Sequence, residues 1–158
     1  MVADAVSLSF LLAFIIPIIM FIKGSDFWWL KLLAYLVITN IGVEGLKMIC
    51  GTQCPRPTLA NNCNAFCRGG AVGGEPGFPS GHMTTSTMFV VIMWLRFGNN
   101  YILLAGVPWL LIMAWSRMIK QCHTWQQICA GMFTGLLFAL LFALLFPLLL
   151  NAKSPWAA

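Results

Sequence analysis

The stretch Ser116 to Ile128, SRMIKQCHTWQQI, is a polar interval between two of the most apolar segments of the chain. It contains His123, one of only two histidines among the 158 residues, and two cations, Arg117 and Lys120. The apolar runs on either side approach the length of about 20 residues that a helix needs to cross a bilayer. The stretch therefore predicts the connection of a membrane helical hairpin that places ionisable groups at the membrane boundary.

The composition extends this pattern to the whole chain. With 60% hydrophobic residues, 8% charged residues and a mean hydropathy of +0.87, it lies outside the range of soluble domains. We expect one all-α domain over residues 1–158, a polytopic transmembrane helix bundle. The third of its spans begins with a polar run and is the shortest. The sequence predicts about five spanning helices, at Ala5–Ile22, Phe27–Ile49, Met83–Phe97, Tyr101–Met118 and Gln127–Leu150.

The charge balance does not indicate a nucleic-acid partner. The net charge is +5, but the cations are scattered and no basic stripe with interleaved aromatic residues is present. The expected environment is the bilayer itself. The final run, residues 136–150, reads LLFALLFALLFPLLL, and we expect this helix to face lipid or to pack loosely.

Five spans would place the connections alternately on two faces. One face would carry the turns Lys23–Asp26 and Arg96–Asn100 and the tail after Leu150. The other would carry the N-terminus, the long loop Cys50–Gly81 and the turn Lys120–Thr124. Ionisable residues at a membrane boundary are functional candidates, and most of them fall on this second face. We therefore expect an active site at one membrane face.

The end of the long loop reads GFPSGHMTTSTMF from residue 77. Ser80 can cap a helix, and Gly81 lets the backbone approach a ligand closely. Free N–H groups at a helix start bind phosphate, and His82 follows in the first turn. The alternative is an ordinary capped helix start with an interfacial histidine.

Three motifs occur in a fixed order. Lys47 precedes CPRP, which contains Arg56; PSGH follows; and Ser116-Arg117 is separated by five residues from His123. This order resembles the type 2 phosphatidic acid phosphatase superfamily, whose pattern is Lys, Arg-Pro, Pro-Ser-Gly-His, then Ser-Arg, five residues and His-x-x-x-Asp. The likeness spans Lys47 to Gln127.

Two departures from the pattern stand out. Eight residues separate Lys47 from Arg56 where the family usually has six, and Gln127 stands where the family has aspartate. HTWQQ is similar to the His-Thr-Trp-x-Gln variant of dolichyl-diphosphatases, and VEGLKM around Glu44 is similar to the same subgroup.

The resemblance implies metal-independent hydrolysis of a lipid phosphate without a cofactor. His123 would attack phosphorus, and His82 would protonate the leaving oxygen and later activate water. Gln127, four residues after His123, shares its helix face and can accept the ring N–H. Glu44 could stabilise the charged intermediate, but we expect it to pair with Lys47. The groups expected to bind phosphate are Lys47, Arg56, Ser80, Gly81 and Arg117.

The cysteines suggest the compartment. Cys50, Cys54, Cys63 and Cys67 lie in the long loop, and an oxidising environment would let them form two disulfides in one of three connectivities. A zinc site is the alternative, but the spacing fits common zinc motifs poorly. Cys122 and Cys129 are expected to be unpaired thiols at the membrane boundary.

The cations away from the site support the same orientation. Lys23, Arg96 and Lys153 on the opposite face are typical of a cytoplasmic side. The active site would then face the lumen or the extracytoplasmic space. The substrate could be a polyprenyl diphosphate, phosphatidic acid or a related lipid.

Two other function classes remain open. A catalytically weakened or inactive lipid-phosphate-binding protein would be consistent with Gln127 in place of aspartate. A small anion channel or transporter would use the cations to line a path, but it would leave the ordered motifs unexplained.

Overall fold

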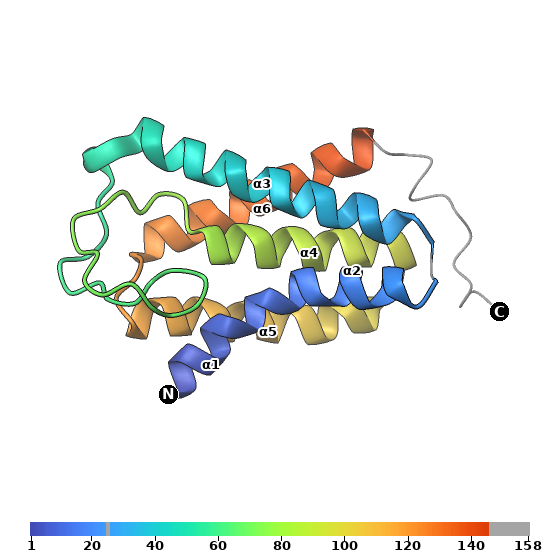
Figure 1. Ribbon diagram of the computed structural model, residues 1–158, viewed down its shortest axis with the longest axis horizontal. Coiled ribbons are helices and arrows are strands. Elements are labelled where there is room, and N and C mark those ends of the chain that lie inside the picture. The colour runs from blue at the N-terminus through green and yellow to red at the C-terminus, as the bar shows by residue number, and fades with distance from the viewer. Residues whose placement is uncertain (25, 146–158) are drawn as a thin grey trace.

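A computed structural model describes residues 1–24 and 26–145 as a bundle of helices (Figure 1). Within these residues there is no β-strand, only isolated bridges between Pro55 and Pro76 and between Asn61 and Ala71. Leu150, the predicted end of the fifth span, lies outside the described residues. The cation Lys153 lies outside them as well. The helices are α1 (Val2–Leu8), η1 (Ser9–Leu11), α2 (Leu12–Ile22), α3 (Trp28–Cys50), η2 (Gly51–Gln53), α4 (Gly81–Phe97), α5 (Asn100–Ile119) and α6 (Trp125–Leu145).

The predicted all-α fold is confirmed, and each predicted span is helical in the described residues. Within the part of the chain that the structure describes, four helical stretches are long and apolar enough to cross a membrane: Val2–Ile22, Trp28–Gln53, Asn100–Ile119 and Trp125–Leu145. The remaining helix, α4, has only 17 residues, a length of about 25 Å at 1.5 Å per residue. The prediction of five spanning helices therefore holds for four by length and composition, and α4 falls short of that length.

Helix α4 is the centre of the bundle. Every residue from His82 to Val90 is buried, and α3, α5 and α6 all pack against it. This position keeps the polar run at its start away from lipid, although the buried hydroxyls of Ser86 and Thr87 have no hydrogen-bond partner. Thr84 donates to the carbonyl of Ser80 at 3.0 Å, and Thr85 donates to Asn40 at 3.2 Å.

Helix α6 has two different faces. Leu137, Leu140 and Leu144 are exposed, as expected for a run that faces lipid, whereas the opposite face packs tightly against α4. A Cβ atom on Gly131 would lie 2.6 Å from the carbonyl oxygen of Ser80, so only glycine permits this approach. Such small-residue contacts are typical of packed membrane helices. Further along, the side chains of Ala139 and Phe142 are fully buried. The contact fixes the start of α6 against the start of α4.

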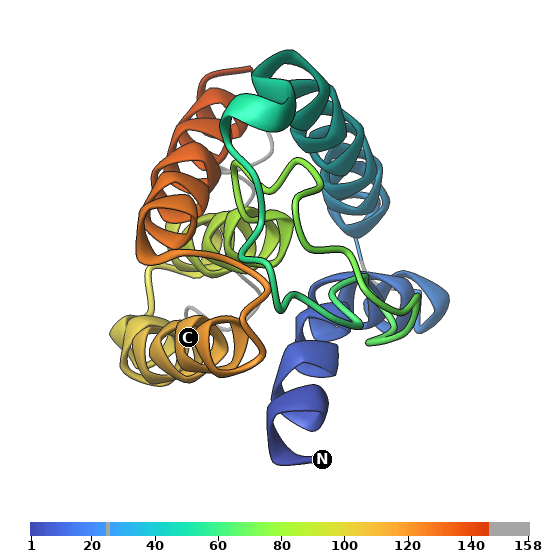
Figure 2. The same cartoon turned by 90° about the vertical axis from the view of Figure 1, so that its left-hand side faces the viewer.

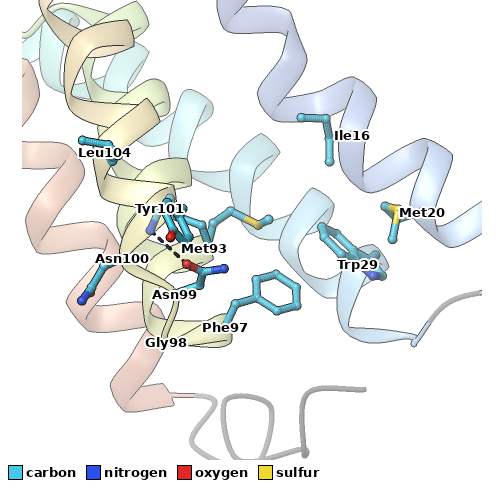
Figure 3. Close-up of a pocket in the computed structure, with 11 residues that line it drawn as sticks. Ile16, Met20, Trp29, Met93, Phe97, Gly98, Asn99, Asn100, Tyr101 and Leu104 are labelled. Atoms are coloured by element: carbon cyan, nitrogen blue, oxygen red, sulfur yellow. Dashed lines mark hydrogen bonds between the residues drawn. The ribbon is translucent and has the colours of Figure 1, made fainter. Parts of the chain in front are cut away.

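The long loop from residue 51 to 80 covers one end of the bundle, together with the N-terminus and the turn at residues 120–124 (Figure 2). The turns after α2 and α4 lie at the opposite end. This alternation matches the predicted arrangement for the described connections. The opposite end contains an apolar crevice of about 1120 Å³ between α2, α4 and α5, with Ile16, Met93 and Tyr101 in its lining (Figure 3).

Candidate active site

The two histidines line one cavity at the loop-covered end of the bundle. Its volume is about 240 Å³, and both rings are almost completely buried, with His82 7% and His123 3% exposed. Lys47, Arg56 and Gly81 also line it. Four separate parts of the chain therefore converge here, namely Phe10 of η1, the end of α3 with its loop, the start of α4 and the turn before α6.

The partners of His123 define its tautomer. Its Nδ1 atom lies 3.0 Å from the carbonyl oxygen of Gly77 and 3.2 Å from Gln127 Oε1, both of which only accept hydrogen bonds. Nδ1 therefore carries the proton. A guanidinium N–H of Arg56 lies 3.4 Å from Nε2 and can only donate. In the neutral ring, Nε2 thus keeps its lone pair on the side of Arg56.

The surroundings of His123 also keep the ring neutral. Burial lowers the pKa of His123 well below its ordinary value, and the nearby charges of Arg56, Arg117 and Lys47 lower it further. The hydrogen bond that His123 donates to Gln127 raises the pKa but does not outweigh these effects. A neutral imidazole with one unprotonated nitrogen is the form that can act as a nucleophile.

Gln127 is held at both ends of its amide. Its Nε2 donates to the carbonyl oxygens of Pro55 at 2.8 Å and Cys54 at 3.3 Å. These bonds fix which side of the amide faces the ring, so Oε1 is the atom presented to His123. The predicted position of Gln127 beside His123 is therefore what the structure contains.

Arg56 is positioned by the loop backbone. Its N–H donates to the carbonyl of Glu75 at 2.8 Å, within the bridge that doubles the loop back on itself. One guanidinium nitrogen donates to the carbonyl of Cys122 at 3.2 Å. The buried Nε of Arg56 has no partner, which leaves a donor available to a ligand.

Lys47 pairs with Glu44, as expected from their spacing in the sequence. Lys47 Nζ lies 2.6 Å from Glu44 Oε1, and the Lys47 side chain is only 12% exposed. Both residues line the cavity. Glu44 therefore balances a site cation and is not hydrogen-bonded to His123.

The PSGH motif forms the start of α4. Ser80 is its N-cap residue, but its side chain makes no capping hydrogen bond, contrary to the simplest expectation. Ser80 Oγ and His82 Nε2 are both buried without a partner. Because buried polar atoms are normally paired, two such atoms beside a cavity lined by cations indicate a place for a polar ligand.

Arg117 differs from the other predicted phosphate-binding residues. Its side chain is fully buried and does not line the cavity. One guanidinium nitrogen donates to Ser7 Oγ at 3.0 Å, and the other donates to the carbonyl of Cys63 at 2.8 Å. Arg117 therefore lies behind the cavity wall that Cys63 forms.

The cysteine prediction is partly wrong. Cys50 pairs with Cys54, but Cys63 pairs with Cys122, which was expected to be a free thiol, and Cys67 is free. The reason is that the loop folds against the turn at residues 120–124, across 59 positions of sequence. Cys129 is unpaired, as expected.

Sequence reasoning did not identify several residues of the site. Gly77 supplies a carbonyl to His123, and its only signal was a glycine in a loop rich in glycine. Ser7 and Phe10 reach the site from the first apolar segment, where no motif indicates them. Among the described residues, no group of three or more His, Cys, Asp or Glu side chains could hold a metal ion.

Comparison with known proteins identifies the family. No curated protein and no solved structure matches the chain. A model of the PAP2 superfamily matches residues 28–150, a region that includes every predicted site residue from Lys47 to Gln127. The long apolar helices and this match are consistent with an integral membrane protein, and the family supports a phosphatase-type function on lipid phosphates. The chain belongs to the PAP2 superfamily, whose members are generally phosphatases.

Proposed function

We propose that the protein is a membrane-embedded lipid phosphate phosphatase that works through a phosphohistidine intermediate at His123. The observation that carries the proposal is the set of hydrogen-bond partners of His123 at the cavity that both histidines line. Its Nδ1 faces Gly77 O and Gln127 Oε1, which leaves the Nε2 lone pair beside Arg56. A nucleophile, a second histidine and two cations at one cavity are what metal-independent phosphoryl transfer needs.

In the first step, His123 Nε2 attacks phosphorus and the bond from phosphorus to the leaving oxygen breaks. His82 is protonated once the anionic phosphate occupies the cavity, and it gives its proton to that oxygen. In the second step, the neutral His82 takes a proton from water, whose oxygen attacks phosphorus. The bond between phosphorus and Nε2 breaks, phosphate leaves, and both histidines return to their starting forms.

The cations and the α4 start hold the phosphoryl oxygens in this mechanism. Arg56 and Lys47 reach the cavity directly, and the backbone at Ser80 and Gly81 supplies N–H groups. Arg117 contributes positive charge from behind the wall. Gln127 orients His123 but supplies no negative charge to a positive phosphohistidine, so turnover is expected to be slower than with a carboxylate.

The substrate is a lipid whose phosphate enters the cavity while its tail stays in the membrane. The HTWQQ sequence and the glutamine beside His123 favour a polyprenyl diphosphate over phosphatidic acid. In the proposed chemistry the two histidines and the cations act without a metal ion. The site faces the lumen or the extracytoplasmic space, because both disulfides lie on its side of the bundle and disulfides persist in oxidising compartments.

The test is phosphate release by the purified protein from a panel of polyprenyl diphosphates, polyprenyl phosphates and phosphatidic acid, with EDTA present throughout. We expect release to persist in EDTA, to stop in His123→Ala and to continue in Cys129→Ser, a change at an exposed free thiol. His82→Ala should lose activity on lipids but recover part of it with p-nitrophenyl phosphate, whose leaving group needs less protonation.

Two outcomes would contradict the proposal. Complete loss of activity in EDTA that is restored by added metal would exclude the histidine mechanism as written. Binding of lipid phosphates without any phosphate release would favour the inactive binding protein instead.

A further inference from the structure

The N-terminal segment, residues 2–22, comprises α1, η1 and α2 and lies outside the matched residues 28–150. It nevertheless contacts the site at two places, one in the cavity and one behind the cavity wall. Phe10 lines the cavity, and Ser7 is bound to Arg117 directly behind it. Both side chains are buried, with Ser7 fully inaccessible.

Phe10 packs on His82. The two ring centroids are 4.2 Å apart, with an angle of 41° between the ring planes. No hydrogen bond restrains the buried His82 Nε2, so the ring depends on packing contacts such as the one with Phe10. A proton donor must hold its geometry closely, because small displacements reduce the rate steeply.

Ser7 completes a chain of hydrogen bonds with a defined direction. Ser116 Oγ donates to the carbonyl of Met113 at 2.8 Å, so its proton is already used. The contact of 3.2 Å between the two hydroxyls must then run from Ser7 to Ser116. Ser7 Oγ is left as the acceptor for Arg117, whose N–H lies 3.0 Å away.

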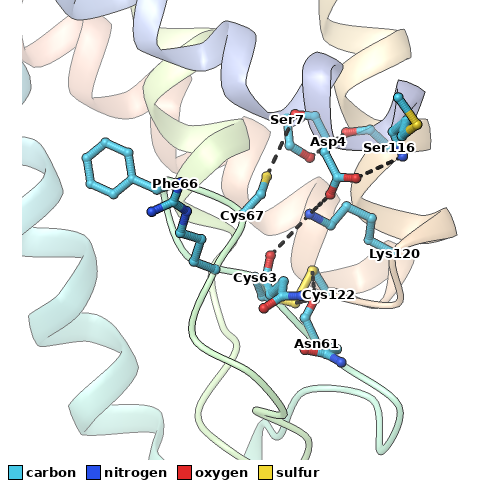
Figure 4. Close-up of polar contacts among 12 residues, drawn as sticks. Asp4, Ser7, Asn61, Cys63, Phe66, Cys67, Ser116, Lys120 and Cys122 are labelled. Atoms are coloured by element: carbon cyan, nitrogen blue, oxygen red, sulfur yellow. Dashed lines mark hydrogen bonds and ion pairs between the residues drawn. A yellow bond between two sulfur atoms is a disulfide. The ribbon is translucent and has the colours of Figure 1, made fainter.

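An ion pair holds the N-terminal segment in place. Lys120 Nζ lies 2.6 Å from Asp4 and donates to the carbonyl of Asn62 at 3.1 Å (Figure 4). The same view shows Ser7 beside Ser116, and the Cys63–Cys122 disulfide below Lys120. The segment, the loop and the turn that carries His123 are thus fastened together.

We propose that the N-terminal segment is a working part of the phosphate site, in which Phe10 positions His82 and Ser7 positions Arg117. This inference rests on the proposed phosphatase function. Both are positioning residues, because each acts through a side chain of the site. Removing Phe10 should therefore weaken proton transfer to the leaving group, whereas removing Ser7 should weaken the hold on phosphate.

The Phe10 test compares Phe10→Leu with Phe14→Leu. Phe14 packs on Phe10 edge to face at 6.0 Å and belongs to the same core cluster, but does not line the cavity. Phe10→Leu should lower kcat/KM about 10- to 100-fold on the lipid substrate and much less on p-nitrophenyl phosphate, the pattern that is also expected for His82→Ala. Phe14→Leu should change kcat/KM for both substrates by the same factor. Equal losses on both substrates in Phe10→Leu would overturn the role of Phe10, because destabilisation lowers both alike.

The Ser7 test compares Ser7→Ala with Ser9→Ala. Ser9 is the matched control, because its hydroxyl accepts a bond from Trp109 at 2.8 Å and touches no site cation. Ser7→Ala leaves a charged donor unpaired, so KM and the inhibition constant for inorganic phosphate should rise about 10-fold, with a smaller change in kcat. Ser9→Ala should leave both constants unchanged, and an unchanged KM in Ser7→Ala would overturn the role of Ser7. The wild-type protein in the same assay separates the two proposals, since only the proposed function fails if it releases no phosphate from any substrate.

Discussion

Gln127 Oε1 lies 3.2 Å from His123 Nδ1, one helical turn along the chain. The same amide donates to the carbonyls of Pro55 and Cys54. Gln127 therefore orients the ring and also joins the start of α6 to the loop that carries Arg56. An aspartate is shorter and could not make the second set of bonds, so the glutamine is matched to this loop.

Replacing Gln127 should separate these two roles. Gln127→Leu removes the acceptor and the donor, and kcat/KM should fall about 100-fold, the scale of misplacing a reacting group by ~1 Å. Gln127→Glu keeps an acceptor beside the ring but loses the donor to the loop, so it should retain more activity than the Leu variant and show a lower Tm. Steady-state kinetics and thermal unfolding in detergent check this. Full activity in Gln127→Leu would show that the contact with Gly77 alone orients His123.

Gly77 has no room for a side chain. A Cβ atom there would lie 2.8 Å from Arg56 Cγ and 3.0 Å from both amide atoms of Gln127. Gly77→Ala should therefore displace both side chains and lower kcat/KM at least about 10-fold. Gly45→Ala is the control, because nothing lies within 4 Å of a Cβ there. Equal activity of the two variants would show that the loop relaxes without disturbing the site.

The helices and the convergence of the motifs could be predicted from the sequence. Apolar runs separated by short polar turns define a helical membrane bundle, and alternation of the connections brings Arg56, His82 and His123 to one end. The spacing of four residues between His123 and Gln127 also predicts their contact. These features depend only on the local pattern of apolar and polar residues and on the alternation of successive helices across the bundle.

Contacts between distant segments could not be predicted in the same way. Which cysteine pairs with Cys63 depends on how a loop of low regularity folds over the bundle, and the sequence offers no period that fixes it. The short α4 looked like a weak span because its polar start suits a buried helix better than a lipid-facing one. Phe10 and Ser7 gave no signal, since one aromatic and one small residue in an apolar helix are ordinary.

The disulfide pairing gives a direct test of the loop. Non-reducing peptide mass spectrometry of protein from its native membrane should find Cys63 linked to Cys122 and Cys50 linked to Cys54, with Cys67 and Cys129 alkylated. A link between Cys63 and Cys67 would contradict the fold of the loop. Four freely alkylated loop thiols would contradict the orientation of the site toward an oxidising compartment.

Breaking the Cys63–Cys122 bridge should also reduce activity. Cys122 precedes His123 and its carbonyl accepts from Arg56, while the carbonyl of Cys63 accepts from Arg117. The double variant Cys63→Ala/Cys122→Ala should lose about 2 to 4 kcal/mol of stability, together with much of its activity. Cys129→Ser is the control. An unchanged Tm and kcat/KM would show that packing alone holds the loop.

The pH dependence should report the charge environment of His123. Burial, and then the charges led by that of Arg56, lower the pKa of this ring, so the reactive neutral form persists below the ordinary value of about 6.5. Arg56→Gln removes the charge that has the largest effect on this pKa, so the pKa of His123 should rise. The acid limb of the profile of kcat/KM against pH should then move to higher pH. Arg68→Gln, at an exposed cation of the same loop, should leave the limb in place. Because the substrate's own phosphate titrates identically with each variant, a difference between profiles reports the protein. If Arg56→Gln lowers kcat/KM without moving the limb, Arg56 acts on the phosphate alone and the limb belongs to another group.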